Sequence, residues 1–145
     1  MRALIQRVTQ ASVNVDNTCV GEIKAGMLVL LGLAQGDDAT KCEKLAQRLL
    51  SYRLFADQYG RMNKSILDIG GELLIVSQFT LCADTHKGLR PGFSTAAAPE
   101  LAEQLYTEFV DHCTAQLTKV ETGIFGADMQ VSLINDGPVT FLLES

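Results

Sequence analysis

The stretch Glu72-Leu73-Leu74-Ile75-Val76-Ser77-Gln78-Phe79 decides the fold, because an unbroken apolar run changes there into polar side chains. Consecutive apolar residues point to both faces of a strand and are typical of a strand that is covered on both sides. Residues 27–34, Met-Leu-Val-Leu-Leu-Gly-Leu-Ala, form a second run of this kind. We therefore predict two buried strands, and the polar end of 72–79 places hydrogen-bonding groups at the rim of a sheet, where pockets tend to form.

Further strands are predicted on either side of this pair. In residues 11–16, Ala11, Val13 and Val15 alternate with Ser12 and Asn14, which is the period of a strand with one buried face. Other segments predicted to be strands are 2–8, 18–23, 119–125 and the two flanks of 135–140.

Two helices are predicted. Thr40 and Glu43 have the spacing of a capping box, and apolar residues then recur at helical spacing to about Arg53. Residues 57–65 form a turn region. Pro99 suits the first turn of the second helix, whose inner stripe is predicted to be Leu101, Leu105, Phe109 and Cys113. Many strands and two main helices predict an α+β fold: one compact domain, residues 1–145, with a largely antiparallel or mixed, barrel-like sheet.

Composition excludes several classes of protein. The net charge is −5 and the pI is near 4.9, which argues against a protein that coats nucleic acid through a broad basic face. The four cysteines are widely spaced and form neither a metal-ligand pattern nor a dense disulfide framework. We expect no metal and no cofactor. No window has the roughly 18 unbroken apolar residues of a membrane span, and we expect a cytoplasmic protein.

The polar residues at the end of the predicted strand 72–79 are candidates for chemistry on a carbonyl or ester. Ser77, Gln78 and Thr80 offer hydroxyl and amide groups, and their backbone N–H groups are candidates for an oxyanion hole. A hydrolase with Thr80 as nucleophile would need an adjacent base, for which His86 is a candidate. Cys82 is an alternative nucleophile. The same side chains also suit ordinary hydrogen bonding at a strand end, and the residues alone leave these alternatives open.

Residues 135–140, Asn-Asp-Gly-Pro-Val-Thr, lie between two apolar runs. A Gly-Pro pair in this position is typical of a turn between two strands. Because about 5–6% of X-Pro bonds in folded proteins are cis, the base rate alone favours a trans bond at Gly137-Pro138.

Four motifs in order give this chain its resemblance to a known family. They are ALIQRV at 3–8, SQFTL at 77–81, RPGFS at 90–94 and NDGPVT at 135–140. Together they resemble the bacterial-type D-aminoacyl-tRNA deacylase family, also called D-tyrosyl-tRNA deacylase. The resemblance implies a homodimer that cleaves D-amino acids from the 3′ end of tRNA, with no cofactor and with an active site shared between subunits.

The resemblance also implies roles for particular residues. Ser77, Gln78, Phe79 and Thr80 would line the ester site. Gly137 and Pro138, joined by a cis bond, would form a chiral selector that reaches into the partner's pocket, and Arg7 would brace it. An L side chain would meet the Gly-Pro backbone and be excluded, whereas glycyl-tRNA would escape this filter.

The implied chemistry does not need a protein base. In this family the 2′-hydroxyl of the terminal adenosine is held to assist cleavage, so the protein supplies orientation and oxyanion stabilisation. An older view makes Thr80 the nucleophile, and the sequence leaves both open. Lys87 and Arg90 are candidates for phosphate contacts at the acceptor end. The rival interpretation is a non-catalytic binding module in which NDGPVT is a plain turn.

Overall fold

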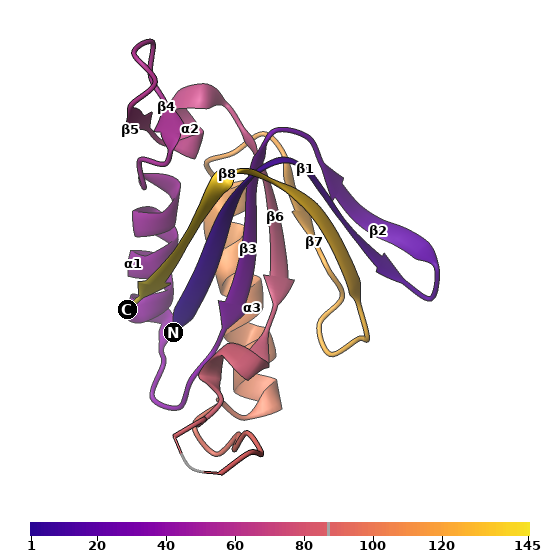
Figure 1. Cartoon of the computed structure of the whole chain (residues 1–145). Helices are drawn as coiled ribbons and strands as arrows, with labels where there is room; N and C mark the ends of the chain where they lie inside the picture. Colours follow the sequence, from indigo (N-terminus) through magenta and orange to yellow (C-terminus); the bar gives the residue numbers. More distant parts are fainter. Residues whose placement is uncertain (87) are drawn as a thin grey trace.

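Strand β1 (Arg2–Val15) organises the sheet, because it has partners along both edges (Figure 1). The computed structural model describes residues 1–86 and 88–145. Along one edge, β8 (Gln130–Glu144) pairs antiparallel with β1 over almost its full length. Along the other edge, β3 (Gly26–Gly32) pairs with the first half of β1 and β2 (Thr18–Ile23) with the second half, both antiparallel.

Strand β6 (Glu72–Ser77) lies between two parallel neighbours, β3 and β7 (Val120–Thr122). Its central residues alternate between two apolar cores. Leu73 and Ile75 belong to the core beneath the helices, and Leu74 and Val76 belong to the core inside the curled sheet. This arrangement explains the unbroken apolar run and confirms the predicted strand covered on both faces.

The sheet curls until β2 approaches β7. A Cβ atom on Gly21 of β2 would lie only 2.7 Å from the carbonyl oxygen of Thr122 in β7, so only glycine permits this approach. The enclosed space is filled by a small core of buried residues: Val8, Ala11, Val13, Ile23, Leu28, Leu74 and Val76. The mixed sheet is therefore nearly closed into a barrel, which confirms the predicted α+β class.

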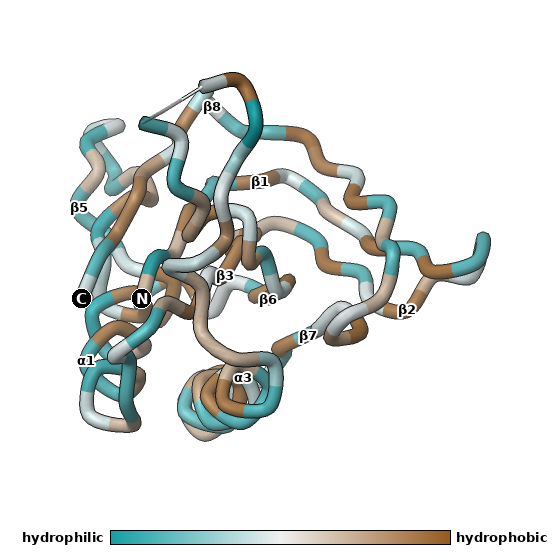
Figure 2. Tube along the Cα trace, turned by 90° about the horizontal axis from the view of Figure 1, so that it is seen from below, coloured by the Kyte–Doolittle hydropathy of each residue, from teal (hydrophilic) through white to brown (hydrophobic). Residues whose placement is uncertain are grey.

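Helices α1 (Ala39–Leu50) and α3 (Pro99–Thr114) lie on the same side of the sheet (Figure 2). The buried phenol of Tyr106 in α3 donates a 2.8 Å hydrogen bond to the carbonyl oxygen of Ile75 in β6. Burial raises the pKa of Tyr106 to about 12, so the phenol stays a donor and ties α3 to the central strand. None of the described helices combines the length and the apolar composition of a membrane span.

Three details of the helix predictions were wrong. The N-cap of α1 is Asp38, whose carboxylate accepts a 2.9 Å bond from the N–H of Lys41, so Thr40 lies within the first turn and caps nothing. The helix ends at Leu50 and not near Arg53. In α3, Leu101 is 39% exposed, and the buried face is formed by Ala102, Leu105, Tyr106, Phe109 and Cys113.

Short elements connect α1 to β6. A small hairpin is formed by β4 (Phe55–Ala56) and β5 (Met62–Lys64), and helix α2 (Ile66–Ile69) follows it; the predicted turn region, 57–65, covers the hairpin tip and β5. Asp57 organises the hairpin tip by accepting bonds from the N–H groups of Tyr59 and Arg61 and from the Asn63 amide. The Arg61 N–H and the Asn63 amide hold the pKa of Asp57 below its ordinary value.

Candidate active site

The SQFTL segment leaves the sheet at the end of β6. Ser77 is the last residue of the strand and pairs with Leu31 of β3. Gln78 then donates its N–H to the carbonyl oxygen of Leu31 at 2.7 Å, and the chain turns into the 3₁₀ helix η1 (Phe79–Cys82). The Arg2 guanidinium holds this helix by donating a hydrogen bond to the carbonyl oxygen of Leu81 at 2.7 Å.

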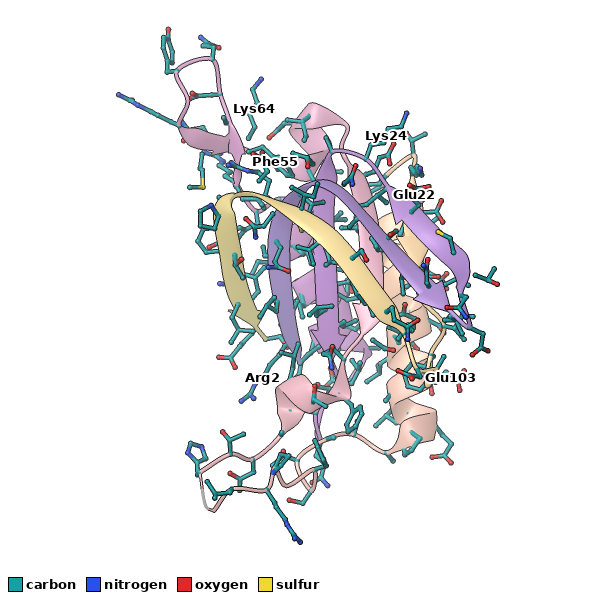
Figure 3. All side chains as sticks on the ribbon, turned by 45° about the vertical axis from the view of Figure 1, so that its right-hand side comes forward. Arg2, Glu22, Lys24, Phe55, Lys64 and Glu103 are labelled. Carbon is teal, nitrogen blue, oxygen red and sulfur yellow. The ribbon has the colours of Figure 1, made fainter. Side chains whose placement is uncertain are left out.

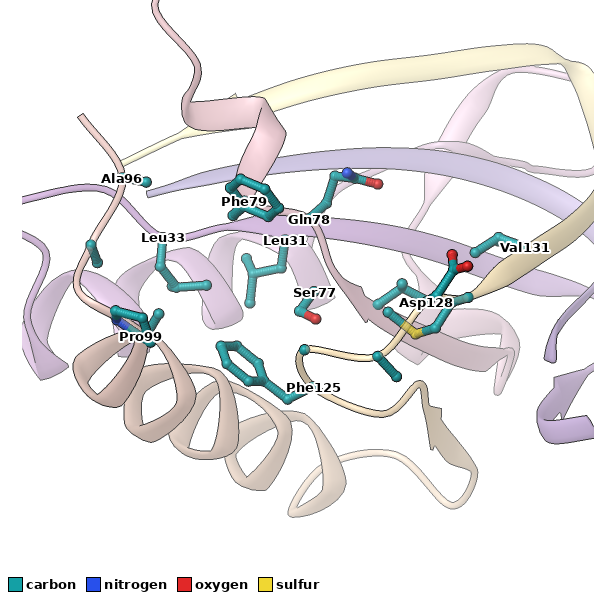
Figure 4. A pocket seen from close by; sticks show the side chains of 16 residues that line it. Leu31, Leu33, Ser77, Gln78, Phe79, Ala96, Pro99, Phe125, Asp128 and Val131 are labelled. Carbon is teal, nitrogen blue, oxygen red and sulfur yellow. The ribbon is translucent and has the colours of Figure 1, made fainter. Parts of the chain in front are cut away.

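A cavity of about 510 Å³ opens beside this strand end (Figure 4). Ser77, Gln78 and Phe79 line it from the SQFTL segment, and Figure 4 shows the Ser77 hydroxyl directed into the space. The opposite wall comes from the start of α3 and from the loop after β7, through Pro99, Ala102, Phe125, Asp128, Met129 and neighbouring residues. The cavity is therefore mostly apolar with a few polar groups, which is typical of a small-ligand site.

Sequence reasoning missed the residues of the opposite wall. Residues 119–125 were predicted to be a strand, but β7 ends at Thr122 and the chain from Gly123 onward forms the loop that lines the cavity. The sequence does contain a signal that the strand ends early, the closely spaced glycines Gly123 and Gly126. In the structure Gly126 adopts a φ of 73°, a backbone conformation that favours glycine.

Thr80 lies beside the cavity and does not line it. Its hydroxyl is exposed and accepts a 2.6 Å hydrogen bond from the Gln78 side-chain amide. Of the four residues predicted to line the ester site, the structure therefore brings three to the cavity and links the fourth to them through Gln78.

The alternative nucleophile and base lie elsewhere. Cys82 and His86 line a different cavity, next to Asp84, whose carboxylate accepts the backbone N–H of His86 at 3.0 Å. Burial raises the pKa of the Cys82 thiol, which disfavours the reactive thiolate. Within residues 1–86 and 88–145, no group of three His, Cys, Asp or Glu side chains could hold a metal ion.

NDGPVT does not reverse the chain. Gln6 pairs with Thr140 and Val8 pairs with Asn135, so the single residue Arg7 lies opposite the four residues 136–139. The segment is therefore a large bulge within one continuous strand, and the sequence-based expectation of a turn between two strands was wrong. The peptide bond between Gly137 and Pro138 is cis. Bulges of this kind redirect backbone and side-chain groups away from the sheet.

Two side chains hold the bulge in shape. Asn135 spans it, accepting the Val139 N–H at 2.7 Å and donating to the Val139 carbonyl oxygen at 3.2 Å. Arg7 donates through Nε to the carbonyl oxygen of Asp136 at 2.9 Å and through its terminal nitrogen to that of Leu54 at 2.8 Å. Arg7 also forms a 3.2 Å ion pair with the Asp136 carboxylate.

The bulge and the cavity lie far apart in one chain. Arg7, opposite the bulge, is four residues along β1 from Ala3, which pairs with Leu31 at the level of Ser77. Four residues of strand span about 13 Å, and the strands β1 and β3 lie between β8, which contains the bulge, and β6, which ends at the cavity. Neither Gly137 nor Pro138 lines the SQFTL cavity. Arg90 is exposed on the loop after η1, whereas the other predicted phosphate contact, Lys87, lies outside the described residues.

Comparisons with known proteins agree on one family. The family model for D-Tyr-tRNA(Tyr) deacylase matches residues 4–144. D-aminoacyl-tRNA deacylases of Shewanella loihica and Teredinibacter turnerae are 60% and 59% identical to this chain, over 99% and 100% of both chains.

Solved structures share the fold. One described as c-Myc DNA Unwinding Element Binding Protein has a TM-score of 0.95 at 40% identity, covering 100% of this chain and 99% of its own. A probable eukaryotic D-amino acid tRNA deacylase has a TM-score of 0.84 at 17% identity, covering 98% and 97%, and shows likeness of fold alone. With a family model over residues 4–144 and relatives near 60% identity, this chain belongs to the D-Tyr-tRNA(Tyr) deacylase family.

Proposed function

We propose that this protein hydrolyses the ester bond of D-aminoacyl-tRNA and releases the D-amino acid and free tRNA. Membership of a family of ester hydrolases favours an enzyme over the non-catalytic binding module. Two features of this chain carry the proposal. One is the small, largely apolar SQFTL cavity, and the other is the NDGPVT bulge, whose backbone is held by Arg7 and Asn135.

The active site is completed by a second copy of the chain. Gly137 and Pro138 are remote from the cavity of their own chain, whereas a two-fold arrangement can place the bulge of each subunit over the cavity of the other. Closed two-fold dimers are the commonest soluble oligomers, and their interface is self-complementary. The homodimer thus has two equivalent sites, each built from SQFTL of one subunit and the Gly-Pro bulge of its partner.

Selection for D-amino acids comes from the backbone of the bulge. The carbonyl oxygens of Gly137 and Pro138 accept hydrogen bonds from the α-amino group of the bound ester. Once the amino group and the ester carbonyl are both fixed, the Cα substituent has one direction left. A D side chain points to solvent, and an L side chain meets the bulge, so discrimination comes from a steric clash. Glycine has no side chain, so glycyl-tRNA is also cleaved.

The chemistry is assisted by the substrate RNA. The N–H groups of Phe79 and Thr80 precede the first internal hydrogen bond of η1, which the N–H of Leu81 makes, so they are candidates to stabilise the oxyanion. The 2′-hydroxyl of the terminal adenosine takes part in cleavage of the neighbouring ester. The protein then supplies orientation, which fits a cavity that contains no histidine.

Only the acceptor end of the tRNA is held. The net charge of −5 argues against a broad basic RNA-binding face, and a cavity of about 510 Å³ admits one aminoacyl-nucleoside. Arg90, exposed on the loop after η1, is the candidate for a phosphate contact. Because the substrate belongs to translation, we place the enzyme in the cytoplasm.

Matched charged tRNAs test the proposed activity. We expect amino acid release from D-tyrosyl-tRNA and from glycyl-tRNA, and no release above the spontaneous rate from L-tyrosyl-tRNA under the same conditions. Equal release from the D and L esters would contradict the chiral filter, and no release from the D ester would contradict the enzyme assignment.

Thr80→Ala distinguishes a positioning role from a nucleophile. The hydroxyl makes one hydrogen bond, with Gln78, and a single bond of this kind contributes about 0.5–1.5 kcal/mol, or roughly a tenfold effect. We expect single-turnover cleavage of D-aminoacyl-tRNA to fall by about that factor. Complete loss of turnover in a folded Thr80→Ala protein would restore Thr80 as the nucleophile.

Removal of both histidines tests for a protein base. His86 lines another cavity and His112 lies in the last turn of α3, so neither lines the SQFTL cavity. The double variant His86→Ala/His112→Ala should keep its deacylation rate within about tenfold of wild type, since general-base catalysis is typically worth about 10²–10⁴-fold. A thousandfold loss in the folded double variant would rule out purely RNA-assisted cleavage.

A further inference from the structure

Two exposed aromatic rings stand at the mouth of the SQFTL cavity. Phe79 lines the cavity and is 58% exposed, and Phe93 is 42% exposed. Their ring centroids are 5.0 Å apart with an interplanar angle of 55°, so the rings form one continuous aromatic surface. Phe93 does not line the cavity, so this surface runs from the cavity wall outward onto the exterior.

Phe93 is held in place by backbone contacts on both sides. The pair Asp84 and Gly92 exchanges two hydrogen bonds, of 2.8 and 2.9 Å, and thereby closes the loop that precedes Phe93. After it, the Phe93 carbonyl oxygen accepts the N–H of Ala96 at 3.1 Å, and Ala96 itself lines the cavity. Backbone hydrogen bonds on both sides of Phe93 therefore fix where its ring lies next to the site, and a contact held in place in advance loses less entropy when a ligand stacks on it.

The size of the cavity limits how much RNA it can hold. A space of about 510 Å³ is in the range for one drug-sized ligand, such as a nucleoside with its aminoacyl group. The polynucleotide that continues from this nucleoside must leave through the mouth. Figure 4 shows Phe79 on the edge of the cavity close to Gln78, so the leaving strand passes a wall that ends in an aromatic ring.

We propose that Phe93, backed by Phe79, is a stacking platform for the base of the nucleotide that precedes the terminal adenosine of the tRNA. This inference rests on the proposed function and adds a binding subsite to it. Proteins that hold single-stranded RNA characteristically stack successive bases on aromatic side chains. The nucleotide before the terminal adenosine belongs to the common CCA end, so a stacking contact with it is available to tRNAs of any body sequence.

The test compares a long and a short substrate. The long substrate is D-tyrosyl-tRNA, and the short one is D-tyrosyl-adenosine, which has the terminal nucleoside ester and lacks the preceding nucleotide. A base stacked on an aromatic side chain is worth about 1–3 kcal/mol, which corresponds to about a 5- to 150-fold effect. We expect Phe93→Leu to lower kcat/KM on D-tyrosyl-tRNA by at least about fivefold and to change kcat/KM on D-tyrosyl-adenosine less than twofold.

Two further variants define the side-chain requirement. Phe93→Trp keeps a flat aromatic face and should retain activity on the tRNA close to wild type. Leu89→Ala is the matched control, because Leu89 belongs to the same loop and is fully exposed but is not aromatic. It should behave as wild type on both substrates. A tRNA with an abasic residue before the terminal adenosine should make wild type and Phe93→Leu equal.

Several results would contradict the proposed stacking role of Phe93. Equal losses on both substrates would mean that Phe93 only supports Phe79 and the cavity. A loss in Leu89→Ala of the same size would assign the contact to the loop in general. A change in oligomeric state of Phe93→Leu by size-exclusion chromatography would make the ring pair a contact between subunits. Failure of the proposed function is distinct, because wild type would then cleave neither D ester.

Discussion

Gly137→Ala is expected to lower the rate of D-aminoacyl-tRNA cleavage by about 100-fold in a protein that still folds. A Cβ atom at this position would lie 2.4 Å from the backbone nitrogen of Val139 and 2.6 Å from its Cγ2 atom. Both distances are too short to persist. Val139 cannot simply move aside, because it is buried and its N–H and carbonyl oxygen are both bonded to Asn135. The bulge itself must therefore change shape.

The size of this effect follows from the role proposed for the bulge. If the carbonyl oxygens of Gly137 and Pro138 hold the α-amino group, a displacement of about 1 Å moves the ester away from its reactive position, and misplacements of that size can cost about 10²-fold in rate. Single-turnover cleavage of D-tyrosyl-tRNA at saturating enzyme measures the loss directly. Circular dichroism and the unfolding midpoint show whether the variant is folded.

Gly92→Ala is the matched control for the added methyl group. At Gly92 a Cβ atom would meet only Asp84, at an ordinary contact distance of 3.8 Å, so the same substitution there should change the cleavage rate by less than about twofold. Wild-type rates for a folded Gly137→Ala protein would show that the shape of the bulge does not control catalysis.

The central strands and the rim of the site could be predicted from the sequence because each depends on a pattern within a few neighbouring residues. The apolar run of 72–77 needs two covered faces, and its polar continuation has to leave the sheet, as the structure shows at Gln78. The mixed sheet and the two main helices follow from the same kind of local pattern, together with the lengths of the connecting segments.

The shape of NDGPVT could not be predicted in this way. Gly-Pro chemistry is the same in a turn and in a bulge, and the choice depends on Arg7, which lies 129 residues away in the chain. Continuous pairing with β1 on both sides of the motif prevents reversal. The far wall of the cavity escaped prediction for a similar reason, since Phe125 and Met129 reach Ser77 only after β7 has docked on β6.

The predicted start of α1 was also wrong, and the physical cause is clear. Asp38 and Thr40 are both good N-cap residues, and Glu43 made Thr40 the more complete pattern. In the structure Asp38 has extended backbone angles and its carboxylate reaches Lys41, so the helix begins two residues before the pattern suggests. Local propensity allowed both starts, and sequence alone could not choose.

Arg7→Lys is expected to lower the cleavage rate by about 10- to 100-fold and the free energy of unfolding by roughly 1.5–3 kcal/mol. The guanidinium of Arg7 bonds two carbonyl oxygens in different directions, those of Asp136 and Leu54, and its side chain is only 16% exposed. A lysine keeps the positive charge but has a single ammonium group and no planar fork, so it cannot hold both carbonyl oxygens. One of them then loses its partner, and the bulge is no longer tied to the β4–β5 hairpin that begins after Leu54 (Figure 3).

Two measurements separate positioning from simple stability. Urea unfolding gives the change in free energy, and single-turnover cleavage of D-tyrosyl-tRNA and glycyl-tRNA at a temperature where the variant is folded gives the change in rate. Because Arg7 holds the bulge and touches no reacting atom, Arg7→Lys should slow both substrates while loosening the exclusion of the L ester. Arg48→Lys is the control, since Arg48 makes one exposed bond, to the carbonyl oxygen of Glu144, that an ammonium group can replace. A folded Arg7→Lys protein with wild-type rates and wild-type rejection of L-tyrosyl-tRNA would remove Arg7 from the selector and leave it a purely structural residue.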